Sequence, residues 1–363
     1  MSEKLKAGII GATGMVGQQF VKLLADHPYF DVSVLAASQR SAGRKYAETV
    51  EGRWKMRTPI PENIKNMTVY DAAQTAKIAD LCDLVFCAVE MPKDETKILE
   101  ETYAKTETPV VSNNSACRNL LDVPMLIPEI NAEHTAVIDT QKKRLGTKRG
   151  FITVKSNCGI LSYVPMLTPL LKFNISKVIA TTYQAISGAG KTFEEMPEII
   201  DNIIPYIGGD EEGKNEREPL KIWGTVSGGE IVNAASPIIT TQCVRVPVTD
   251  GHLAAVFVKF TNDPPPKEEI LELWRGFKGK PQELKLPGAP RQFIHYFEEP
   301  DRPQTGLDRD LENGMAVSAG RLREDTIFDY KFIGLSHNTL RGAAGGGVLS
   351  AELLYKLGYI AKK

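Results

Sequence analysis

Short apolar runs alternate with segments of helical periodicity over about the first 120 residues. Amphipathic segments such as 15–28 and 93–105 separate runs that are rich in Val, Ile and Leu, at 5–11, 30–38, 83–89 and 108–115. Continuous apolar strands flanked by amphipathic helices are typical of a parallel sheet that is covered on both faces. We therefore predict an N-terminal α/β domain with a doubly wound, Rossmann-type parallel sheet.

The pattern changes after a polar, basic segment at 142–150. Longer strand-like runs then follow with fewer helical segments between them, at 177–187, 239–248, 252–260 and 328–336. This spacing favours an α+β domain with a mixed sheet. We predict a first domain over residues 1–155, completed by an amphipathic C-terminal helix within 339–363, and a second domain over 156–338.

Composition narrows the class of protein. At 363 residues the chain is long enough for two cores, and its formal charge of −1 gives no bulk attraction to nucleic acid or to a membrane surface. No leader and no run of about 20 apolar residues is evident, so we expect a cytosolic protein. Five cysteines without a CxxC pair predict neither a disulfide framework nor a zinc site, and we expect no metal.

A glycine-rich turn lies between the first predicted strand and the first predicted helix. Its sequence, GATGMVG, places Gly11, Gly14 and Gly17 three residues apart. Glycine permits a tight turn and close approach of a backbone, and the N–H groups at a helix N-terminus bind pyrophosphate. In this strand–turn–helix context the motif predicts a dinucleotide site, although a merely structural turn is the alternative.

The residues after the second strand favour NADP over NAD. An acidic residue at that point would bind the ribose 2′-hydroxyl, but the chain has Ser38, Arg40 and Ser41 there. A guanidinium can hold a 2′-phosphate through two parallel hydrogen bonds. The alternative is a solvated arginine on a surface loop.

Cys158 is the candidate nucleophile among the five cysteines. It follows the strand 151–155 and precedes an apolar segment of helical periodicity from about residue 160. A helix N-terminus would favour the thiolate, and nearby N–H groups could receive an oxyanion. On this context alone a buried structural cysteine is an equal alternative. Cys82, Cys87 and Cys243 lie in or beside apolar strands and are interpreted as structural.

His252 is the candidate partner for that cysteine. It follows the turn VTDG, which joins two predicted strands, and Arg245 lies seven residues before it. An arginine near the end of one strand and a histidine at the start of the next can line one cleft. From the spacing alone, a histidine that belongs only to the turn is the stronger alternative. His27, His134 and His295 have no catalytic surroundings.

Several motifs occur together in the order found in one enzyme family. They include GATGMVG (11–17), AASQRSAGRKY (36–46), VVSNNSACR (110–118), KSNCGI (155–160), TYQAISGAG (182–190), IGGDEEGKNE (207–216), RVPVTDGH (245–252), RPQTGLDRD (302–310) and NTLRGAAGG (338–346). Across nearly its whole length the chain thus resembles the aspartate-semialdehyde dehydrogenases, in particular their fungal and archaeal branch. The resemblance implies that Cys158 is the nucleophile and that His252 is an acid/base.

The same resemblance implies a cofactor site and a substrate site. NADP would contact Gly11, Thr13, Gly14, Met15, Val16, Gly17, Ser38, Arg40, Ser41, Ser187, Gly188 and Asn338. Arg245 would bind the substrate carboxylate and Gln184 would orient the carbonyl group. Phosphate would bind Asn114, Arg118 and Lys214. For the substrate ammonium the alternatives are Asp210, Glu211 and Glu212, of which Glu211 shares a helical face with Lys214.

The implied reaction is the reversible, NADPH-dependent conversion of L-4-aspartyl phosphate to L-aspartate 4-semialdehyde and phosphate, through a thioester on Cys158. It belongs to lysine, threonine and methionine biosynthesis. The implied partners are these small molecules and further copies of the chain, as a homodimer or homotetramer joined through the second domain. Two rivals remain. One is a related acyl-phosphate reductase such as N-acetyl-glutamyl-phosphate reductase, and the other is a non-catalytic NADP-binding regulator.

Overall fold

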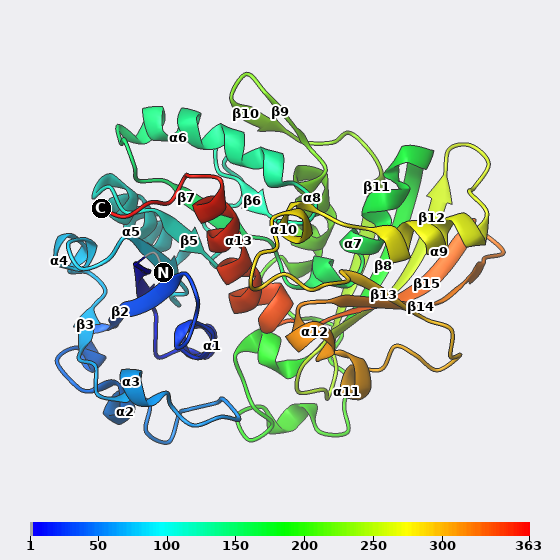
Figure 1. Ribbon diagram of the computed structural model, residues 1–363. Coiled ribbons are helices and arrows are strands. Elements are labelled where there is room, and N and C mark those ends of the chain that lie inside the picture. Colours follow the sequence, from blue (N-terminus) through cyan, green and yellow to red (C-terminus); the bar gives the residue numbers. More distant parts are fainter. Residues whose placement is uncertain (1–2) are drawn as a thin grey trace.

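The computed structural model describes residues 3–363 and contains two large sheets side by side (Figure 1). The first sheet has seven strands in the order β3-β2-β1-β4-β5-β7-β6, and every neighbouring pair is parallel. Its strands are β1 (Leu5–Ile10), β2 (Phe30–Ala37), β3 (Val69–Asp71), β4 (Leu84–Cys87), β5 (Val110–Ser112), β6 (Met125–Leu126) and β7 (Ile152–Lys155). The prediction of a doubly wound parallel sheet is confirmed.

Helices cover this sheet because its strands bury apolar side chains on both faces. The helices of this region are α1 (Met15–Leu24), α2 (Tyr46–Thr49), α3 (Glu62–Lys65), α4 (Thr75–Ala79), α5 (Lys93–Lys105) and α6 (Ile138–Leu145). The C-terminal helix α13 (Gly345–Lys356) returns to pack beside α1 and against β5 and β7, as the red helix in Figure 1 shows.

The predicted amphipathic character of α13 is wrong. Every residue from Gly345 to Leu354 is buried, because the helix lies between the two sheets and has no free outer face. Its first turn is preceded by a π-helical turn, Leu340–Ala344. Its buried residues are mostly apolar, as expected for a buried helix, and the carboxylate of Glu352 is paired with His27 and the N–H of Gly288.

The second sheet has six strands in the order β11-β8-β12-β15-β14-β13. Its strands are β8 (Ile175–Gln184), β11 (Ile238–Arg245), β12 (His252–Phe260), β13 (Ile294–Phe297), β14 (Val317–Glu324) and β15 (Tyr330–Ser336). The pairs β8/β11 and β13/β14 are parallel and the others are antiparallel, so the predicted mixed sheet is confirmed. A small hairpin, β9 (Thr225–Ser227) and β10 (Glu230–Val232), lies outside both sheets.

One face of the second sheet packs against helices and turns, and the other is only half-buried. The covering elements include a 3-10 turn (Gly159–Ser162), α7 (Val164–Leu167), α8 (Glu211–Ile222) and α9 (Lys267–Gly276). The remaining short helices are α10 (Lys280–Glu283), α11 (Thr305–Asp308) and α12 (Leu311–Gly314). Along β8 and β12, buried and half-exposed residues alternate, as expected when one face of a strand meets a core.

The basic segment 142–150 does not join the two domains. It contains the last turn of α6, which ends at Gly146 in the left-handed conformation, and β7 then returns to the first sheet. The chain passes between the sheets after β7 and again after β15. Boundaries at 155 and 338 fit these crossings and stay a proposal. Within residues 3–363, no helix is both long and apolar enough to cross a bilayer.

Candidate active site

The glycine turn between β1 and α1 leaves no room for side chains at two of its glycines. Gly11 has a φ of +87°, and a methyl group on it would lie 2.2 Å from the carbonyl oxygen of Ala88. A methyl group on Gly17 would lie 2.1 Å from the carbonyl oxygen of Gly11. Helix α1 begins at Met15, directly after this turn. The turn therefore has the tight backbone that a pyrophosphate-binding loop requires.

A polar pocket opens from this turn toward the end of β2. Ser38, Arg40 and Ser41 line it, as predicted, together with Gly11, Thr13 and Gly14. Sequence reasoning missed Arg44 and Arg53, which line the same pocket. Arg44 belongs to the quoted run 36–46 and could have been found there. Three guanidinium groups around one pocket are suited to a phosphate group.

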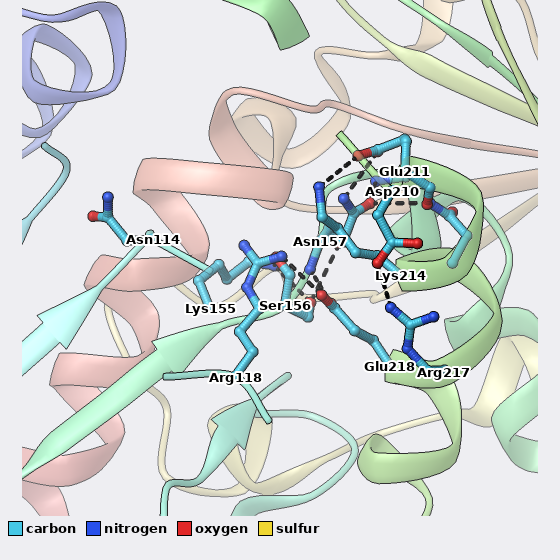
Figure 2. Close-up of polar contacts among 12 residues, drawn as sticks. Asn114, Arg118, Lys155, Ser156, Asn157, Asp210, Glu211, Lys214, Arg217 and Glu218 are labelled. Carbon is cyan, nitrogen blue, oxygen red and sulfur yellow. Dashed lines mark hydrogen bonds and ion pairs between the residues drawn. The ribbon is translucent and has the colours of Figure 1, made fainter. Parts of the chain in front are cut away.

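A second pocket lies on the other side of the turn and touches both domains. Met15, Val16, Ser187, Gly188 and Asn114 line it. The structure therefore places Asn114 on the cofactor side, where its amide donates to the carbonyl oxygen of Val89 at 2.6 Å. Figure 2 shows it apart from Arg118, and its part in the phosphate site stays a prediction. It follows β5, whose carboxyl end faces the glycine turn.

Asn338 lies close to Ser187, as the predicted cofactor site requires. Its amide donates to Ser187 Oγ at 2.8 Å, and its Oδ1 accepts the N–H of Gly251 at 2.8 Å. Sequence reasoning missed the preceding residue, His337. Its Nε2 lies 3.6 Å from a carboxylate oxygen of Asp310 at the boundary between the domains.

Cys158 and His252 meet although 94 positions separate them. Cys158 Sγ lies 3.3 Å from His252 Nε2. The predicted helix after Cys158 is instead a four-residue 3-10 turn, so the cysteine has no long helix dipole behind it. Burial and the nearby Glu211 carboxylate raise the pKa of the Cys158 thiol to about 11. The fold at this position therefore does not by itself favour the thiolate.

The ring of His252 is held in one orientation by the backbone. Its Nδ1 accepts the N–H of Ala185 at 3.1 Å. Because a backbone N–H can only donate, Nδ1 keeps its lone pair, and the neutral ring carries its hydrogen on Nε2, toward Cys158. Burial and the charge of Arg245 lower the pKa of His252 well below its usual value. The imidazole is therefore neutral and presents an N–H to the sulfur.

Three neighbouring strands bring the other polar side chains to this point. Gln184 ends β8, and the sheet register pairs it with Arg245 at the end of β11. On its other side, β12 begins with His252, one position before the pair Leu253–Tyr183. Strand ends that meet at one edge of a sheet place their side chains together. The sequence predicted all three residues, but this common edge becomes visible only in the structure.

Arg245 is buried beside the cysteine and histidine. Its Nη1 donates to the carbonyl oxygen of Ala185 at 2.7 Å. Within residues 3–363, none of the ion pairs includes it. A methyl group on Gly188 would lie 2.9 Å from its Nη1 and 3.0 Å from His252 Cε1, so the cofactor-side loop touches both side chains. A buried guanidinium with one backbone partner is suited to bind an anionic group.

Of the three acidic candidates, Glu211 is the one that faces the site. Its Oε1 accepts from Asn157 Nδ2 at 2.9 Å and from Gln184 Nε2 at 3.2 Å, and its Oε2 lies 3.3 Å from Lys214 Nζ. Asp210 instead pairs with Arg217 at the surface, and Glu212 accepts the backbone N–H of Cys243. Figure 2 shows Glu211 and Lys214 near Asn157.

Arg118 lies on the opposite side of Asn157 from Glu211. Its Nη1 lies 2.9 Å from Glu218, and its Nη2 donates to the carbonyl oxygen of Asn113 at 3.2 Å. Glu218 also accepts the backbone N–H of Asn157. Sequence reasoning missed Glu218, because only the fold brings α8 next to the segment after β7 that carries the nucleophile (Figure 2).

The remaining cysteines are buried, in agreement with their structural interpretation. Burial raises the pKa of Cys82 to about 12 and that of Cys243 to about 12. Cys158 is the one cysteine of residues 3–363 that is not fully buried. In the same range, no group of three or more His, Cys, Asp or Glu side chains is arranged to hold a metal ion.

Comparison with known proteins gives one consistent result. Two family models match the chain: "Semialdehyde dehydrogenase, NAD binding domain" over residues 6–138 and "Semialdehyde dehydrogenase, dimerisation domain" over residues 167–341. Aspartate-semialdehyde dehydrogenase from Aspergillus fumigatus is 42% identical, over 98% of this chain and 99% of its own length. The enzyme of that name from Archaeoglobus fulgidus is 42% identical, over 97% and 98%.

Solved structures agree with these relatives. The crystal structure of aspartate-semialdehyde dehydrogenase with NADP from Candida albicans has a TM-score of 0.88 and 39% sequence identity, covering 99% of this chain and all of that one (100%). An aspartate-semialdehyde dehydrogenase II from Vibrio cholerae has a TM-score of 0.73 at 25% identity, over 98% of this chain and 99% of its own. The likeness therefore extends over both domains.

Proposed function

This chain belongs to the aspartate-semialdehyde dehydrogenase family, and we propose that Cys158, His252, Gln184 and Arg245 form its active site. It is an oxidoreductase of amino-acid biosynthesis with aspartate-semialdehyde dehydrogenase activity. The observation that carries the site proposal is the 3.3 Å contact between Cys158 and His252, next to an arginine that lacks a carboxylate partner within residues 3–363. A thiol, a hydrogen-bond donor and a fixed cation are what an enzyme needs to bind and acylate an amino-acid derivative.

The cofactor is NADP, with which the Candida albicans relative was crystallised. The two glycine positions that exclude any side chain fit the pyrophosphate, and Arg40, Arg44 and Arg53 fit the 2′-phosphate. Ser187 and Asn338 would hold the nicotinamide end beside Cys158. When bound, NADPH supplies the hydride, and the protein supplies orientation and charge.

Aspartyl phosphate and the semialdehyde share an α-carboxylate and an α-ammonium group. Arg245 would bind the carboxylate through two hydrogen bonds, and Glu211 would accept from the ammonium. Gln184, which donates to Glu211 in the structure, would orient the carbonyl group. Arg118 and Lys214 would bind phosphate. Their present partners, Glu218 and Glu211, hold them in place in its absence.

The proposed reaction proceeds through a thioester on the sulfur of Cys158. In the biosynthetic direction the thiolate of Cys158 attacks the acyl carbon, the bond to the phosphate oxygen breaks, and a thioester remains. Reduction of that thioester gives a thiohemiacetal alkoxide, which collapses to the aldehyde and regenerates the thiolate. The departing phosphate must take up one proton to leave as hydrogen phosphate, and water can supply it. The other steps need no proton if the sulfur begins as a thiolate.

His252 would act mainly as a hydrogen-bond donor. Its Nε2–H points at the sulfur and can reach the alkoxide oxygen, while its Nδ1 is occupied by the N–H of Ala185. A neutral imidazole can stabilise an oxyanion without giving up its proton. The predicted acid/base role includes assistance to the thiohemiacetal and removal of the thiol proton. The local hydrogen bonds favour the first, through hydrogen-bond donation by His252, over the second.

The dimerisation-domain match implies a homo-oligomer. We propose that copies pair through the half-exposed face of the second sheet, where Ile179 and Phe257 are neighbours on β8 and β12. Whether two or four chains assemble stays a prediction, and so does the cytosolic location.

Replacing the nucleophile tests the proposal directly. Cys158→Ala should lower phosphate-dependent oxidation of aspartate semialdehyde to background, because the other described cysteines are buried. Binding of NADPH, followed by fluorescence titration, should stay within about twofold because the cofactor pockets are unchanged. The wild-type protein with N-acetylglutamate semialdehyde is the substrate control. Substantial turnover by the alanine variant would show that another group forms the thioester.

A further inference from the structure

A buried lysine without a carboxylate partner lies close to the nucleophile. Lys155 is the last residue of β7, three positions before Cys158, and only 3% of its surface is exposed. Its Nζ donates to Ser156 Oγ at 3.0 Å and lies 3.5 Å from the Ser156 carbonyl oxygen. Within the described chain, no ion pair includes it. Burial of an ammonium group without a counter-charge costs several kcal/mol, so this position requires an explanation.

Three other buried cations nearby have partners that stabilise their charge. Arg118 pairs with Glu218, and Arg341 pairs with Glu129 through two nitrogens. Lys221 donates to three backbone carbonyl oxygens at 2.6 to 2.9 Å. Compared with these three residues, Lys155 lacks a partner that would stabilise its charge.

Lys155 and Cys158 are covered by neighbouring glycines of the C-terminal part of the chain. A methyl group on Gly346 would lie 2.5 Å from Lys155 Cε, and one on Gly342 would lie 2.8 Å from Cys158 Cβ. Gly342 lies in the π-helical turn and Gly346 in the first turn of α13, so one continuous backbone segment covers both side chains. Figure 2 shows Lys155 beside Ser156 and Arg118.

The charges around Lys155 come from several elements. Arg341 from the π-helical turn and Arg118 after β5 oppose its protonation, whereas Cys158 and Glu218 from α8 favour it. Burial and the two arginines lower the pKa of Lys155 to about 7. Protonation of this side chain is therefore sensitive to the charge of the sulfur.

Cys158 in turn needs a counter-charge that His252 does not supply. The imidazole is neutral, with Nδ1 occupied by a backbone N–H, so it cannot become an imidazolium without losing that bond. Lys155, Arg118 and Arg245 are the cations whose charges favour the thiolate. Arg118 is already neutralised by Glu218, and the proposed function assigns Arg245 to the substrate carboxylate.

We propose that Lys155 is a positioning residue whose ammonium group is the counter-charge of the Cys158 thiolate. When the thiol ionises, its proton leaves the sulfur and the amine of Lys155 gains one, so the net charge of the pair is unchanged. The inference rests on the proposed role of Cys158 as nucleophile. It extends the site by a residue that contacts neither substrate nor cofactor.

The test measures ionisation of the sulfur rather than turnover. Alkylation of the wild type and of Lys155→Met by iodoacetamide is followed from about pH 6 to pH 10, and mass spectrometry assigns the label to Cys158. In Lys155→Met the alkylation rate at each pH of this range should fall about tenfold, which corresponds to a thiol pKa about one unit higher. In the pH profile of kcat/KM, the acidic limb should move to higher pH by the same amount.

Lys221→Met is the matched control, because it removes a buried ammonium group that does not act on Cys158. It should lower the melting temperature and leave the alkylation profile unchanged. Lys155→Gln serves as a second variant that keeps a polar end, and it should shift the profile as Lys155→Met does. Thermal unfolding shows which variants are folded at the assay temperature.

Two outcomes would overturn the inference. One is an unchanged alkylation profile in a folded Lys155 variant. The other is a raised KM for phosphate with an unchanged profile, which would place Lys155 in the phosphate site. Neither affects the role of Cys158. That role fails only if Cys158→Ala keeps its activity, so failure of the inference and failure of the proposed function are distinguishable.

Discussion

Arg245 is a buried cation whose side chain has one hydrogen-bond partner, the carbonyl oxygen of Ala185. Burial lowers the pKa of this guanidinium, and the negative charges of Cys158 and Glu211 act against that effect. Such a group gains most from a ligand that brings its own negative charge. Its rigid fork also fixes where the carboxylate lies relative to the sulfur.

Arg245→Lys should raise the KM for aspartate semialdehyde by about tenfold or more, since a lysine cannot make two parallel hydrogen bonds to one carboxylate. The KM for NADPH should change little. Steady-state kinetics with each substrate varied in turn measures both constants. Arg323→Lys, at an exposed position on β14, is the control. An unchanged KM for the semialdehyde would rule out the assigned role.

The roles of single residues were predictable where a sequence motif identifies them. They were less predictable where the packing of distant segments determines the surroundings of the side chain. Cys158, His252 and Arg245 were identified from the sequence and meet in the structure. Asn114 was assigned to the phosphate site. In the structure its side-chain amide donates a hydrogen bond to the carbonyl oxygen of Val89, which follows β4 and lines the cofactor pocket. Lys155 was quoted only as part of a motif, because its burial depends on α13, almost 200 positions later.

At the scale of elements, the parallel strands were predictable because both of their faces are apolar. The turn after Cys158 was not, since a 3-10 turn and an α-helix share a similar apolar pattern over four residues. The two-residue strand β6 is too short for any period to appear. The burial of α13 also escaped prediction, because it depends on α1 and the first sheet on one side and on Leu286 and Met315 on another.

The turn before α13 sets the position of the nucleophile. Gly342→Ala would bring a methyl carbon to 2.8 Å from Cys158 Cβ, which is closer than ordinary contact, so either the turn or the cysteine must move. We expect kcat to fall by about tenfold or more, with NADPH affinity nearly unchanged. Stopped-flow acylation and a cofactor titration measure the two quantities. Gly276→Ala, where the space is open, is the control, and equal kinetics in both variants would contradict this role.

At the scale of the whole molecule, the half-exposed face of the second sheet is the apolar surface that an oligomer would cover. Ile179, Leu253, Phe257 and Ile333 lie on it, and 69% of Ile238 on the edge strand is exposed. Apolar groups that gather on one sheet face are typical of subunit interfaces.

Ile179→Arg should therefore shift the protein toward a smaller species, because it would bury an unpaired charge between subunits. Light scattering coupled to size-exclusion chromatography measures the mass across a dilution series. Ile98→Arg, on exposed α5 of the first domain, should leave the mass unchanged. If the mass of the Ile179 variant also stays constant down to high dilution, copies do not pair through this face.

The return of α13 to the first sheet has a consequence for how the protein is made. The ribosome completes β7 and Cys158 well before it reaches α13 (Gly345–Lys356), the helix that covers the end of β7. Until those residues emerge, the strands β5 and β7 lack one of their covers. A nascent chain thus holds its nucleophile in an unfinished setting, and catalytic competence requires that α13 has been synthesised and has docked.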